Sequence, residues 1–577
     1  MDAARRRRRF LAPIETPAAA GTPHVVVLGG GYVAINLCRA LAGAIADRRI
    51  DVTVVTGENY HTYHGFVGEM VSGRVSPSHI LSPVRRLFAP ARVQVGEIQS
   101  IDLEGKRAVV ARHLDGHRTE VTWDHVVLSL GVADRTDAYP GLFEHAFRLR
   151  EYRECFRLKN HIITMFEQAE IEDDPAERRR LLTFFVAGGG YAGTEVIGEL
   201  SDFARRLTSR EYPRVRYDEC RFVLVHPGPT ILPELYGDDG TGAKAHPKLV
   251  AFADQWVRKL GVEVRTQTRV AFATPNEVTL SNGERFPTRT IISSVGTRPQ
   301  ELVAGLDLPK DGRGRIVVER TGLVVGQTEV WAGGDCSAFP MPRGGDSPPV
   351  ALYAYEHGKR IGRNLRRTLV EHRKPKPFRF PGIGQGASIG NRCGVAEIYG
   401  VEITGLLCWF VWRSMLTFYF PSWDRRLHLI SDWLIWPLVG RDVISMRVGE
   451  QSDYEVHHNV FQPGEIIVSE QRAGRFIHII VDGEVEIVHS YKSVEAVLNT
   501  LGPGDHFGQR WFESTDTESA RAKTIVRTLS LRREQAPRLQ EVIASAGKLM
   551  EGSIHGPITI DSNLLQSGRR GNDDTDA

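Results

Sequence analysis

The sequence predicts an α/β protein with two Rossmann-like domains, an interfacial helical segment and a small β-barrel or jelly-roll domain. Two glycine-rich turns, each between a short apolar strand and a helical stretch, predict the two α/β domains. Apolar segments interrupted by arginine and tryptophan within residues 401–448 predict helices that lie in an interface. Short strands at regular spacing after residue 457 predict the β domain.

Length and composition narrow the class of protein. At 577 residues the chain is long for one hydrophobic core, so several domains are expected. A net charge of +3 favours no bulk acidic or basic partner, and we expect no nucleic-acid binding. The six cysteines form no CxxC pair, which argues against a disulfide framework, a zinc or other metal site and a dithiol redox centre. A reducing, cytoplasmic compartment fits this cysteine usage.

An unbroken basic run, Arg5–Arg9, lies in the stretch 1–22 that precedes the first strand. One interpretation is a disordered, solvated arm. The other is attraction to anionic lipid, at about 1 kcal/mol per residue near a membrane surface. No hydrophobic signal-peptide core follows the arginines, so we expect no secretion.

The first glycine-rich turn follows the predicted strand His24–Leu28 and opens a helix that runs to about Ala46. Its fingerprint positions are Gly29, Gly31 and Ala34. This spacing suits a dinucleotide, whose pyrophosphate binds at the helix N-terminus. The next predicted strand normally ends in an acidic residue that binds the ribose hydroxyls. Here Thr56 stands at that place and Glu58 comes two residues later, so either Glu58 reaches the ribose or the Thr56 hydroxyl makes a weaker contact.

The second glycine-rich turn follows the apolar run Leu182–Val186, which predicts a buried parallel strand. Its fingerprint positions are Gly188, Gly190 and Gly193. They allow a tight turn, a close approach to a pyrophosphate and close packing of helix on strand. His226 follows the second strand of this domain, and an imidazole cannot accept ribose hydroxyl bonds as a carboxylate does. NADH, NADPH and weak nicotinamide binding therefore all stay open.

Further segments complete the site of the first domain. Two strands end in Gly131 and Gly296, where the chain crosses between nucleotide domains. Thr328–Asp335 resembles the T-x-x-x-x-G-D segment of two-dinucleotide-domain flavoproteins, whose aspartate binds the flavin ribityl chain. Gly334 and Asp335 carry that resemblance, which implies FAD as the cofactor. The alternative is a plain strand end with an aspartate turn.

Residues 24 to about 443 resemble a type II NADH dehydrogenase, a single-subunit flavoprotein that passes electrons from NADH to quinone. The matching stretches are Asn59–His61, Gly188–Glu195, Gly334–Asp335, the helix starting near Pro348 and the block Ala396–Arg413. The resemblance implies FAD, NAD(P)H as co-substrate, and a quinone or other membrane acceptor. It also implies a cofactor-site role for His61. Hydride would pass from the nicotinamide to the flavin, which would then pass electrons to the acceptor on its other side.

The predicted acceptor helix departs from this family. The family helix reads Ala-Gln-x-Ala-x-Gln-Gln-Gly, whereas Ala351–Gly358 carries Leu352 and Glu356 in place of the two pocket-lining amides. Either this helix forms a different pocket or its side chains pack in the core or on the surface. The acceptor-site candidates are Leu352, Tyr353, Glu356 and His357, with Tyr355 beside them.

Two carboxylates on the second fingerprint helix are the predicted catalytic residues. Glu195 and Glu199 are four residues apart and therefore share a helix face. In the family a carboxylate from this region lies near flavin and nicotinamide. The alternative is a pair of solvated helix charges.

The segment from 405 to 439 raises the question of a membrane. No uninterrupted apolar run reaches the roughly 18 residues that span a bilayer. Arg413 and Thr417 fall on one stripe, and aromatic residues alternate with arginines as in helices that lie in a membrane interface. The family resemblance favours a cytoplasmic protein that lies peripherally on the inner face of the cell membrane. The alternative is a buried core or the surface of a homodimer.

The C-terminal β domain resembles a cyclic nucleotide-binding domain, which implies a cyclic nucleotide as a further partner. The candidate site residues are Gly508, Gln509, Arg521 and Ala522. Gln509 replaces the family's ribose-binding glutamate, and the Arg521-Ala522 pair comes three residues later than usual. Carboxylates between them disfavour an anionic ligand, so the fold is predicted and nucleotide binding stays open.

These predictions divide the chain into six parts: a basic arm (1–22), a FAD-binding domain (23–149 and 290–400), an NAD(P)H-binding domain (150–289), membrane-interface helices (401–448), a cyclic nucleotide-binding-like β domain (449–545) and a disordered tail (546–577). Two other functions remain. A sulfide:quinone-type enzyme would need paired redox cysteines, and Cys155 and Cys336 are not evidently placed for that role. A flavin-containing redox sensor with little turnover would fit the departures at His226, Leu352, Glu356 and Gln509.

Overall fold

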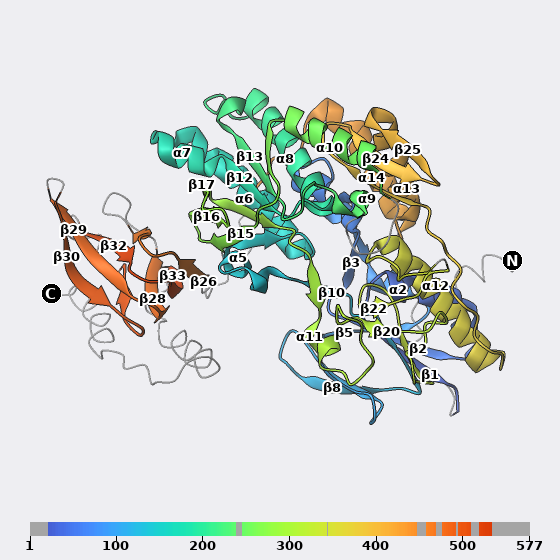
Figure 1. The fold of residues 1–577 in the computed structure, drawn as a ribbon. Helices are drawn as coiled ribbons and strands as arrows, with labels where there is room; N and C mark the ends of the chain where they lie inside the picture. The colour runs from blue at the N-terminus through green and yellow to red at the C-terminus, as the bar shows by residue number, and fades with distance from the viewer. Residues whose placement is uncertain are drawn as a thin grey trace, which may run out of the picture.

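The computed structural model describes residues 21–237, 245–342, 344–446, 457–468, 476–491, 494–508 and 518–532. The predicted basic arm up to residue 20, the predicted tail and Gln509 lie outside these ranges. Within them the chain forms two α/β domains, a pair of helices with a small sheet, and a β domain (Figure 1). The predicted fold class is confirmed.

The first α/β domain is built on a five-stranded parallel sheet with the order β21-β9-β1-β2-β5. The strands are β1 (His24–Leu28), β2 (Asp51–Thr56), β5 (Arg92–Val95), β9 (His125–Leu128) and β21 (Val330–Ala332). The valine- and leucine-rich strands β1, β2, β9 and β21 are mostly buried, as expected for a parallel sheet covered on both faces, whereas the edge strand β5 is half-buried. Helices α2 (Tyr32–Ala46) and α12 (Ala351–Leu365) pack closely, because Gly358 lies against the backbone of Val33.

The second α/β domain is inserted into the first and has the parallel order β11-β18-β12-β13-β14. Its strands are β11 (Ala146–Arg148), β12 (Thr183–Ala187), β13 (Arg221–Val225), β14 (Val262–Arg265) and β18 (Thr290–Ser293). Its main helices are α6 (Tyr152–Ile171), α8 (Tyr191–Arg210) and α10 (Pro247–Lys259). The antiparallel pair of β10 (Val132–Asp134) and β19 (Thr297–Pro299) joins the two domains.

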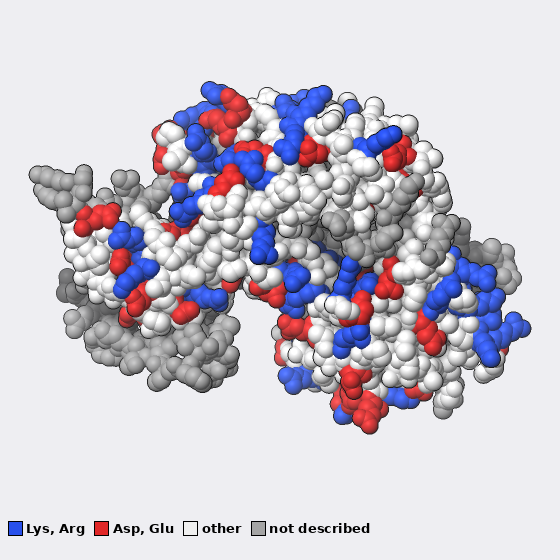
Figure 2. Space-filling view, viewed as in Figure 1, with Lys and Arg blue, Asp and Glu red and all other residues white. Residues whose placement is uncertain are grey.

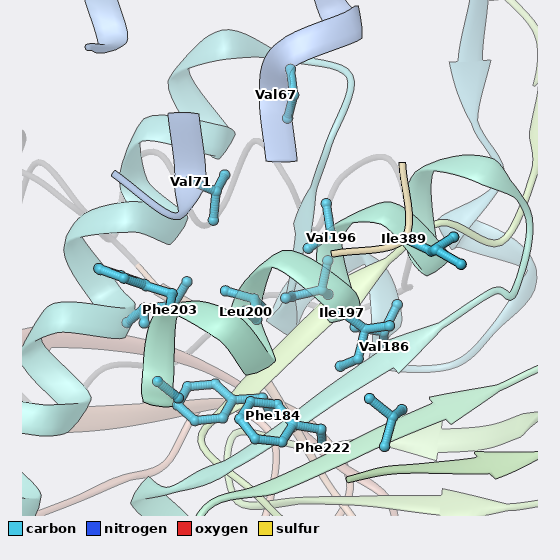
Figure 3. Packing of buried hydrophobic residues seen from close by; sticks show 14 of the residues in the cluster. Val67, Val71, Phe184, Val186, Val196, Ile197, Leu200, Phe203, Phe222 and Ile389 are labelled. Carbon is cyan, nitrogen blue, oxygen red and sulfur yellow. The ribbon is translucent and has the colours of Figure 1, made fainter. Parts of the chain in front are cut away.

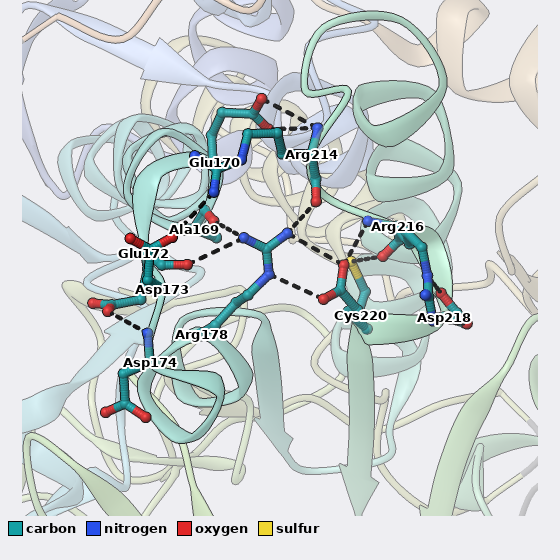
Figure 4. A network of polar contacts seen from close by, with 11 residues as sticks. Ala169, Glu170, Glu172, Asp173, Asp174, Arg178, Arg214, Arg216, Asp218 and Cys220 are labelled. Atoms are coloured by element: carbon teal, nitrogen blue, oxygen red, sulfur yellow. Dashed lines mark hydrogen bonds and ion pairs between the residues drawn. The ribbon is translucent and has the colours of Figure 1, made fainter.

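The core of the second domain extends into the first. Figure 3 shows Val67 and Val71 of α3 (Val67–Val71) beside the apolar face of α8, which covers Phe184 and Phe222 of the sheet. On the outer side, Arg178 of α7 (Pro175–Leu181) ties α6 to the start of β13 (Figure 4). Its guanidinium contacts the Glu219 carboxylate at 3.0 Å and the Ala169 carbonyl. These contacts hold α6, α7 and the turn before β13 together.

The two domains also contain smaller sheets of two or three strands. They are β3 (Tyr60–Thr62) with β4 (Leu81–Pro83); β6 (Glu97–Asp102), β7 (Arg107–Ala111) and β8 (Arg118–Thr122); β15 (Val270–Ala273), β16 (Glu277–Leu280) and β17 (Arg285–Pro287); and β20 (Ile316–Val317) with β22 (Ser337–Ala338). The short helices are α4 (Val84–Phe88), α5 (Leu142–His145), α9 (Pro233–Tyr236) and α11 (Glu301–Ala304).

A three-stranded antiparallel sheet leads into the predicted interfacial helices. The sheet comprises β23 (Gly384–Ser388), β24 (Gly394–Ile398) and β25 (Val401–Thr404), and the helices are α13 (Gly405–Tyr419) and α14 (Trp423–Val439). Eleven large apolar side chains of these helices are exposed: Leu406, Leu407, Phe410, Phe418, Trp423, Leu427, Ile430, Leu434, Ile435, Leu438 and Val439. Within the described ranges, none of the helices has the length and apolarity that crossing a membrane requires.

The C-terminal β domain has two four-stranded antiparallel sheets with the orders β26-β33-β28-β31 and β27-β32-β29-β30. Its strands are β26 (His457–Phe461), β27 (Ile466–Val468), β28 (Phe476–Asp482), β29 (Val485–Tyr491), β30 (Val494–Leu501), β31 (His506–Phe507), β32 (Glu518–Ala522) and β33 (Val526–Arg532). Apolar side chains from both sheets form its core. Figure 1 shows this domain beside β15–β17 and α5 of the second α/β domain.

Candidate functional site

Two cavities meet between the α/β domains. The first has a volume of about 1110 Å³ and is lined by both glycine-rich turns. The second has a volume of about 810 Å³ and lies among α12, α13 and the sheet β23–β25. Four residues line both cavities and form a shared wall: Tyr32, Tyr191, Glu195 and Ala351.

The first fingerprint forms a cradle at one end of the first cavity. Gly29 has φ +110°, and a Cβ there would lie 2.2 Å from the Ser129 carbonyl oxygen. A Cβ on Gly30 would lie 2.2 Å from Oγ1 of Thr56, so only glycine fits against that threonine. Gly31 starts α2 without a side-chain cap, so the N-terminus of α2 faces the cavity with backbone donors. This arrangement fits a dinucleotide pyrophosphate.

Most of the predicted cofactor residues reach this cavity. Those that line it are Gly31, Thr56, Glu58, His61, Gly131, Gly190, Gly296, Gly334 and Asp335. The lining does not include Gly29, Ala34, Gly188, Gly193 or His226. Gly29 and Gly188 form the turns, Ala34 is buried in α2, and Gly193 packs against the Gly188 carbonyl. His226 lies behind the second turn, where its Nδ1 accepts a hydrogen bond from the Gly189 amide at 3.3 Å.

Burial shifts the pKa values of two titratable groups in the first cavity. The ring of His61 lies edge-on to Tyr32, with 4.6 Å between centroids. Burial lowers the pKa of His61 to about 3, so this imidazole is uncharged at neutral pH. Burial also raises the pKa of the Asp335 carboxyl above its ordinary value. The neutral imidazole and the aspartate suit hydrogen bonds to the polyhydroxylated part of a cofactor.

The second fingerprint has an acidic neighbour that the sequence did not indicate. Oε1 of Glu234, on α9, lies 3.4 Å from the Tyr191 amide at the N-terminus of α8. A Cβ on Gly190 would lie 2.6 Å from the same oxygen. A carboxylate therefore stands where this fingerprint would place the phosphates of a dinucleotide.

Glu195 lies on the shared wall, as its predicted catalytic role requires. The Ser388 amide donates a hydrogen bond to Oε1 at 2.9 Å. Burial, together with the nearby carboxylates Glu69, Glu199 and Glu234, raises the pKa of this carboxyl to about 8. Glu195 is therefore mostly protonated at neutral pH and can donate a proton to a ligand in either cavity.

Glu199 has a different place from the one predicted. It lines neither cavity, and its carboxylate accepts from Ser72 Oγ at 3.2 Å and from Arg74 Nη1 at 3.3 Å. Arg74 also pairs with Asp202, which in turn pairs with Arg441. The four-residue spacing puts both glutamates on one face, but Arg74 of the first domain covers Glu199 and gives it a structural role.

The second cavity contains only part of the predicted acceptor site. Leu352 and Tyr353 line it, together with Tyr355. Glu356 lies outside the lining and pairs with Lys359 at 2.6 Å. His357 also lies outside it: Nδ1 accepts from the Gly334 amide at 3.2 Å, Nε2 contacts Ser347 Oγ at 3.2 Å, and the ring stacks on Phe339. His357 thus supports the turn beside Asp335 instead of the acceptor site.

Other residues of this cavity were not predicted. They include Tyr63, His246, Gln385, Trp412, Met415, Leu416 and Tyr419. Gln385 accepts a hydrogen bond from the Tyr191 hydroxyl at 3.1 Å, which brings an amide into the cavity from β23 instead of from α12. Trp412 belongs to the block Ala396–Arg413, and the resemblance of this block to the family is the sequence feature that could have indicated it. Gln385 and His246 carry no sequence motif.

Three of the four candidate cyclic nucleotide residues, Gly508, Arg521 and Ala522, lie in the described part of the β domain. Ala520 and Ala522 are buried in the β-domain core, so Arg521 between them points to the opposite face of β32. Its guanidinium pairs there with Glu486 at 3.0 Å and Glu495 at 2.8 Å. Gly508 forms a turn with φ +99° after β31, and Gln509 lies outside the described residues. Arg521 therefore lies on the face of β32 away from the buried side chains of Ala520 and Ala522, and its role in binding a cyclic nucleotide stays a prediction.

The two cysteines considered for a sulfide-oxidising enzyme line neither cavity. Cys155 donates to the Leu149 carbonyl and Cys336 to the Gly333 carbonyl. Burial raises the pKa of the Cys336 thiol to about 11, and that of Cys155 is also raised. Neither thiol is positioned or ionised for attack on a substrate in these cavities.

Three family models match this chain. A model described as pyridine nucleotide-disulphide oxidoreductase matches residues 23–358. A model described as the NDH2 C-terminal domain matches 384–442, and one described as the cyclic nucleotide-binding domain matches 458–542.

Individual proteins are similar over most of their length. The type II NADH:quinone oxidoreductase NdhA of Mycobacterium tuberculosis is 26% identical over 76% of this chain and 92% of its own. The mitochondrial internal alternative NAD(P)H-ubiquinone oxidoreductase A1 of Arabidopsis thaliana is 26% identical over 73% of this chain and 85% of its own. The structure of NDH2 from Plasmodium falciparum in complex with NADH superposes with a TM-score of 0.67, at 16% identity, and covers 73% of this chain and 100% of that one.

The predicted resemblance to type II NADH dehydrogenases is thereby confirmed, and the matched models cover both the α/β domains and the helical segment. The chain belongs to the pyridine nucleotide-disulphide oxidoreductase family and adds to it an NDH2-type C-terminal segment and a cyclic nucleotide-binding-type β domain.

Proposed function

We propose that this protein is an NAD(P)H dehydrogenase that passes electrons from NAD(P)H, through FAD, to a membrane quinone. One observation carries the proposal: the two cavities share a wall of Tyr32, Tyr191, Glu195 and Ala351. A flat redox cofactor at this wall would contact a donor on one side and an acceptor on the other. The relatives named NADH:quinone and NAD(P)H-ubiquinone oxidoreductases support this assignment.

FAD fits the first cavity. The α2 N-terminus and the glycine turn at Gly29–Gly31 would hold its pyrophosphate, and Asp335 would hold its ribityl chain. Bound there, FAD supplies hydride acceptance and electron transfer. The protein's own groups orient the reactants, and the protonated Glu195 can hold a proton at the shared wall.

The acceptor that best fits the second cavity is a lipid-soluble quinone. Its wall is largely apolar and aromatic, with Trp412, Met415, Leu416 and Tyr419 contributed by α13. The large apolar side chains of α13 and α14 that are exposed do not line this cavity. Transfer of these apolar side chains from water into the boundary of a bilayer is favourable in free energy.

We infer peripheral association with the inner face of the cell membrane. Lys and Arg gather over α12 and the turn after it (Figure 2), where Lys359, Arg360, Arg363, Arg366 and Arg367 lie. Basic side chains next to an apolar face favour an anionic leaflet, at about 1 kcal/mol per charge near its surface. Homodimer formation and a cyclic nucleotide ligand stay predictions.

An anaerobic titration tests the proposal. Protein purified with FAD is mixed with NADH or NADPH, and the flavin absorbance is followed. We expect rapid bleaching with at least one of them, and recovery when a soluble quinone is added. A flavin that stays oxidised with both nucleotides would overturn the proposal.

A redox sensor with little turnover is the second candidate. The Glu234 carboxylate at the α8 N-terminus favours it, since a carboxylate opposes the binding of nucleotide phosphates. Steady turnover with NAD(P)H and quinone would exclude this candidate.

A further inference from the structure

A buried histidine–carboxylate pair lies on the wall of the second cavity. His246 precedes α10, is held by a hydrogen bond from its amide to the Leu235 carbonyl at 2.7 Å, and lines the cavity. Its Nδ1 lies 2.8 Å from Oε1 of Glu402 on β25. The His246 side chain is 5% exposed and that of Glu402 is 34% exposed. The pair therefore connects the cavity with the solvent at the protein surface.

We propose that His246 is the proton donor to the acceptor bound in the second cavity, and that Glu402 is its positioning residue. The proposal rests on the proposed function. Reduction of a quinone by NAD(P)H follows NAD(P)H + H⁺ + quinone → NAD(P)⁺ + quinol. The nicotinamide C–H bond breaks, two electrons reach the quinone, and one O–H bond forms at each carbonyl oxygen. One of the two protons originates in the nicotinamide hydride and the other in solvent.

The two carbonyl oxygens need separate donors because they lie at opposite ends of the quinone ring. Glu195 stands on the shared wall and can serve only the oxygen near that wall. His246 belongs to the second cavity alone, so it can serve the other oxygen. Because two protons are needed, the acceptor requires a second proton donor at a distance from Glu195. His246 offers this donor outside the shared wall.

The hydrogen bond to Glu402 gives the imidazole the properties of a donor. It engages Nδ1 and leaves Nε2 as the ring nitrogen that can serve the cavity. The carboxylate orients the ring, as the aspartate does in a serine protease triad. The partly exposed Glu402 keeps the pair in contact with water, from which the proton is replaced.

Other titratable groups surround this pair and contribute to its pH dependence. They are Lys248 on α10, Glu234 and Tyr236 on α9, Glu397 on β24, Tyr399 in the turn before β25, and Tyr353 and Glu195 across the cavity. Because of these neighbours, the experiment compares variants at each pH and does not assign a single inflection to His246.

The test compares two acceptors in the FAD-loaded protein. A quinone accepts electrons with protons, whereas ferricyanide accepts electrons alone. Stopped-flow absorbance follows flavin bleaching by NAD(P)H and then reoxidation by each acceptor, for wild type, His246→Gln, Glu402→Gln and the exposed control His117→Gln. Quenching of tryptophan fluorescence measures equilibrium binding of a quinone to the oxidised protein, since Trp412 lines the cavity.

We expect His246→Gln to slow reoxidation by quinone about 10- to 100-fold, which is the range of general acid catalysis. Glu402→Gln slows it less, and both variants flatten the pH profile of that step. Bleaching by NAD(P)H, reoxidation by ferricyanide and quinone affinity stay within about two-fold of wild type. Unchanged quinone reoxidation in His246→Gln would overturn the inference, and so would an affinity loss as large as the rate loss. A wild type that no quinone reoxidises would instead refute the proposed function.

Discussion

The Glu465 carboxylate of the β domain accepts hydrogen bonds from Thr274 Oγ1 and Asn276 Nδ2 of the second α/β domain, each at 2.9 Å. Gln462 adds a contact from the same turn to Thr279 at 2.9 Å, and the Val460 amide donates to His145 at 3.0 Å. His145 ends α5, and the strand β11 that follows leads directly to residues 149–153 on the wall of the first cavity. The added domain thus contacts a segment that also shapes the cofactor site.

Removing the central carboxylate of this contact should release the β domain. Glu465→Ala removes the acceptor shared by the buried Thr274 and the half-buried Asn276, and a buried donor that loses its partner costs about 1–3 kcal/mol. We expect faster hydrogen exchange in β16 and β26 and a larger radius of gyration in solution scattering. Glu484→Ala, which removes an exposed carboxylate paired with Lys523, is the matched control and should change neither. Equal exchange in the two variants would show that this contact does not hold the domain.

The raised pKa of Glu195 should make stability depend on pH. Its folded-state pKa of about 8 exceeds the ordinary value of a glutamate, so the folded protein binds more protons between those values than the unfolded chain. The free energy of unfolding therefore falls as pH rises toward 8, by at most about 1.4 kcal/mol per pH unit, and the fall ends above that pH.

Thermal unfolding of Glu195→Gln at several pH values checks this sign. The uncharged amide cannot ionise, so the variant should gain stability relative to wild type between pH 6 and 9 and should match it most closely near pH 4. Glu120→Gln, at an exposed position of β8, is expected to track wild type throughout. A constant difference between Glu195→Gln and wild type across this range would contradict the assignment.

Glu234 should weaken nicotinamide binding. Its carboxylate lies at the N-terminus of α8, where backbone donors would otherwise attract the dinucleotide phosphates. We expect Glu234→Ala to tighten NAD(P)H binding about five- to ten-fold. The affinity of Glu234→Gln should lie between the affinities of Glu234→Ala and wild type. Calorimetric titration of the oxidised protein with NAD⁺ and NADP⁺ measures the effect. Glu211→Ala, at the exposed C-terminal end of the same helix, should leave both affinities unchanged, and weaker binding in Glu234→Ala would reverse the interpretation.

The local sequence was sufficient to predict the strands, the glycine turns and much of the cofactor cavity, because these features depend on residues close together in the chain. The predicted strand His24–Leu28 is β1 as observed, and the apolar run Leu182–Val186 differs from β12 by one residue. Glycines with positive φ at Gly29 and Gly188 follow from the fingerprint alone. These features position the cofactor cavity.

Residues whose role depends on distant partners could not be predicted. Helical spacing treats Glu195 and Glu199 alike, yet Arg74, 125 positions from Glu199, captures only the latter. Helix α12 likewise offers both Tyr353 and His357, and only packing against Phe339 shows that His357 faces the core. Gln385 and His246 reach the acceptor cavity from a short strand and a helix start that carry no motif. A resemblance to a family helix pointed to the right element but not to the side chains that line the cavity.

The helical segment should depend on one buried ion pair. Arg413 of α13 pairs with Glu69 of α3, and both side chains are less than a tenth exposed. Trp433 Nε1 of α14 donates to the same carboxylate at 3.1 Å, so Glu69 anchors both helices to the first domain. Arg413→Ala would leave Glu69 buried without its cation, which typically costs about 3–5 kcal/mol. We expect a lower midpoint of urea unfolding and weaker flotation with anionic vesicles.

A double variant separates the ion pair from the packing of its side chains. In Arg413→Met with Glu69→Gln neither member of this pair carries a charge, the methionine fills much of the arginine's volume, and the amide oxygen still accepts from Trp433. Replacing a buried pair by neutral groups of similar size is often close to neutral, so this variant should recover most of the stability and the vesicle binding. If it is as unstable as Arg413→Ala, the arginine acts through its contacts with Trp409 and Trp433, whose rings lie 4.2 and 4.5 Å from its guanidinium carbon, and not through its charge.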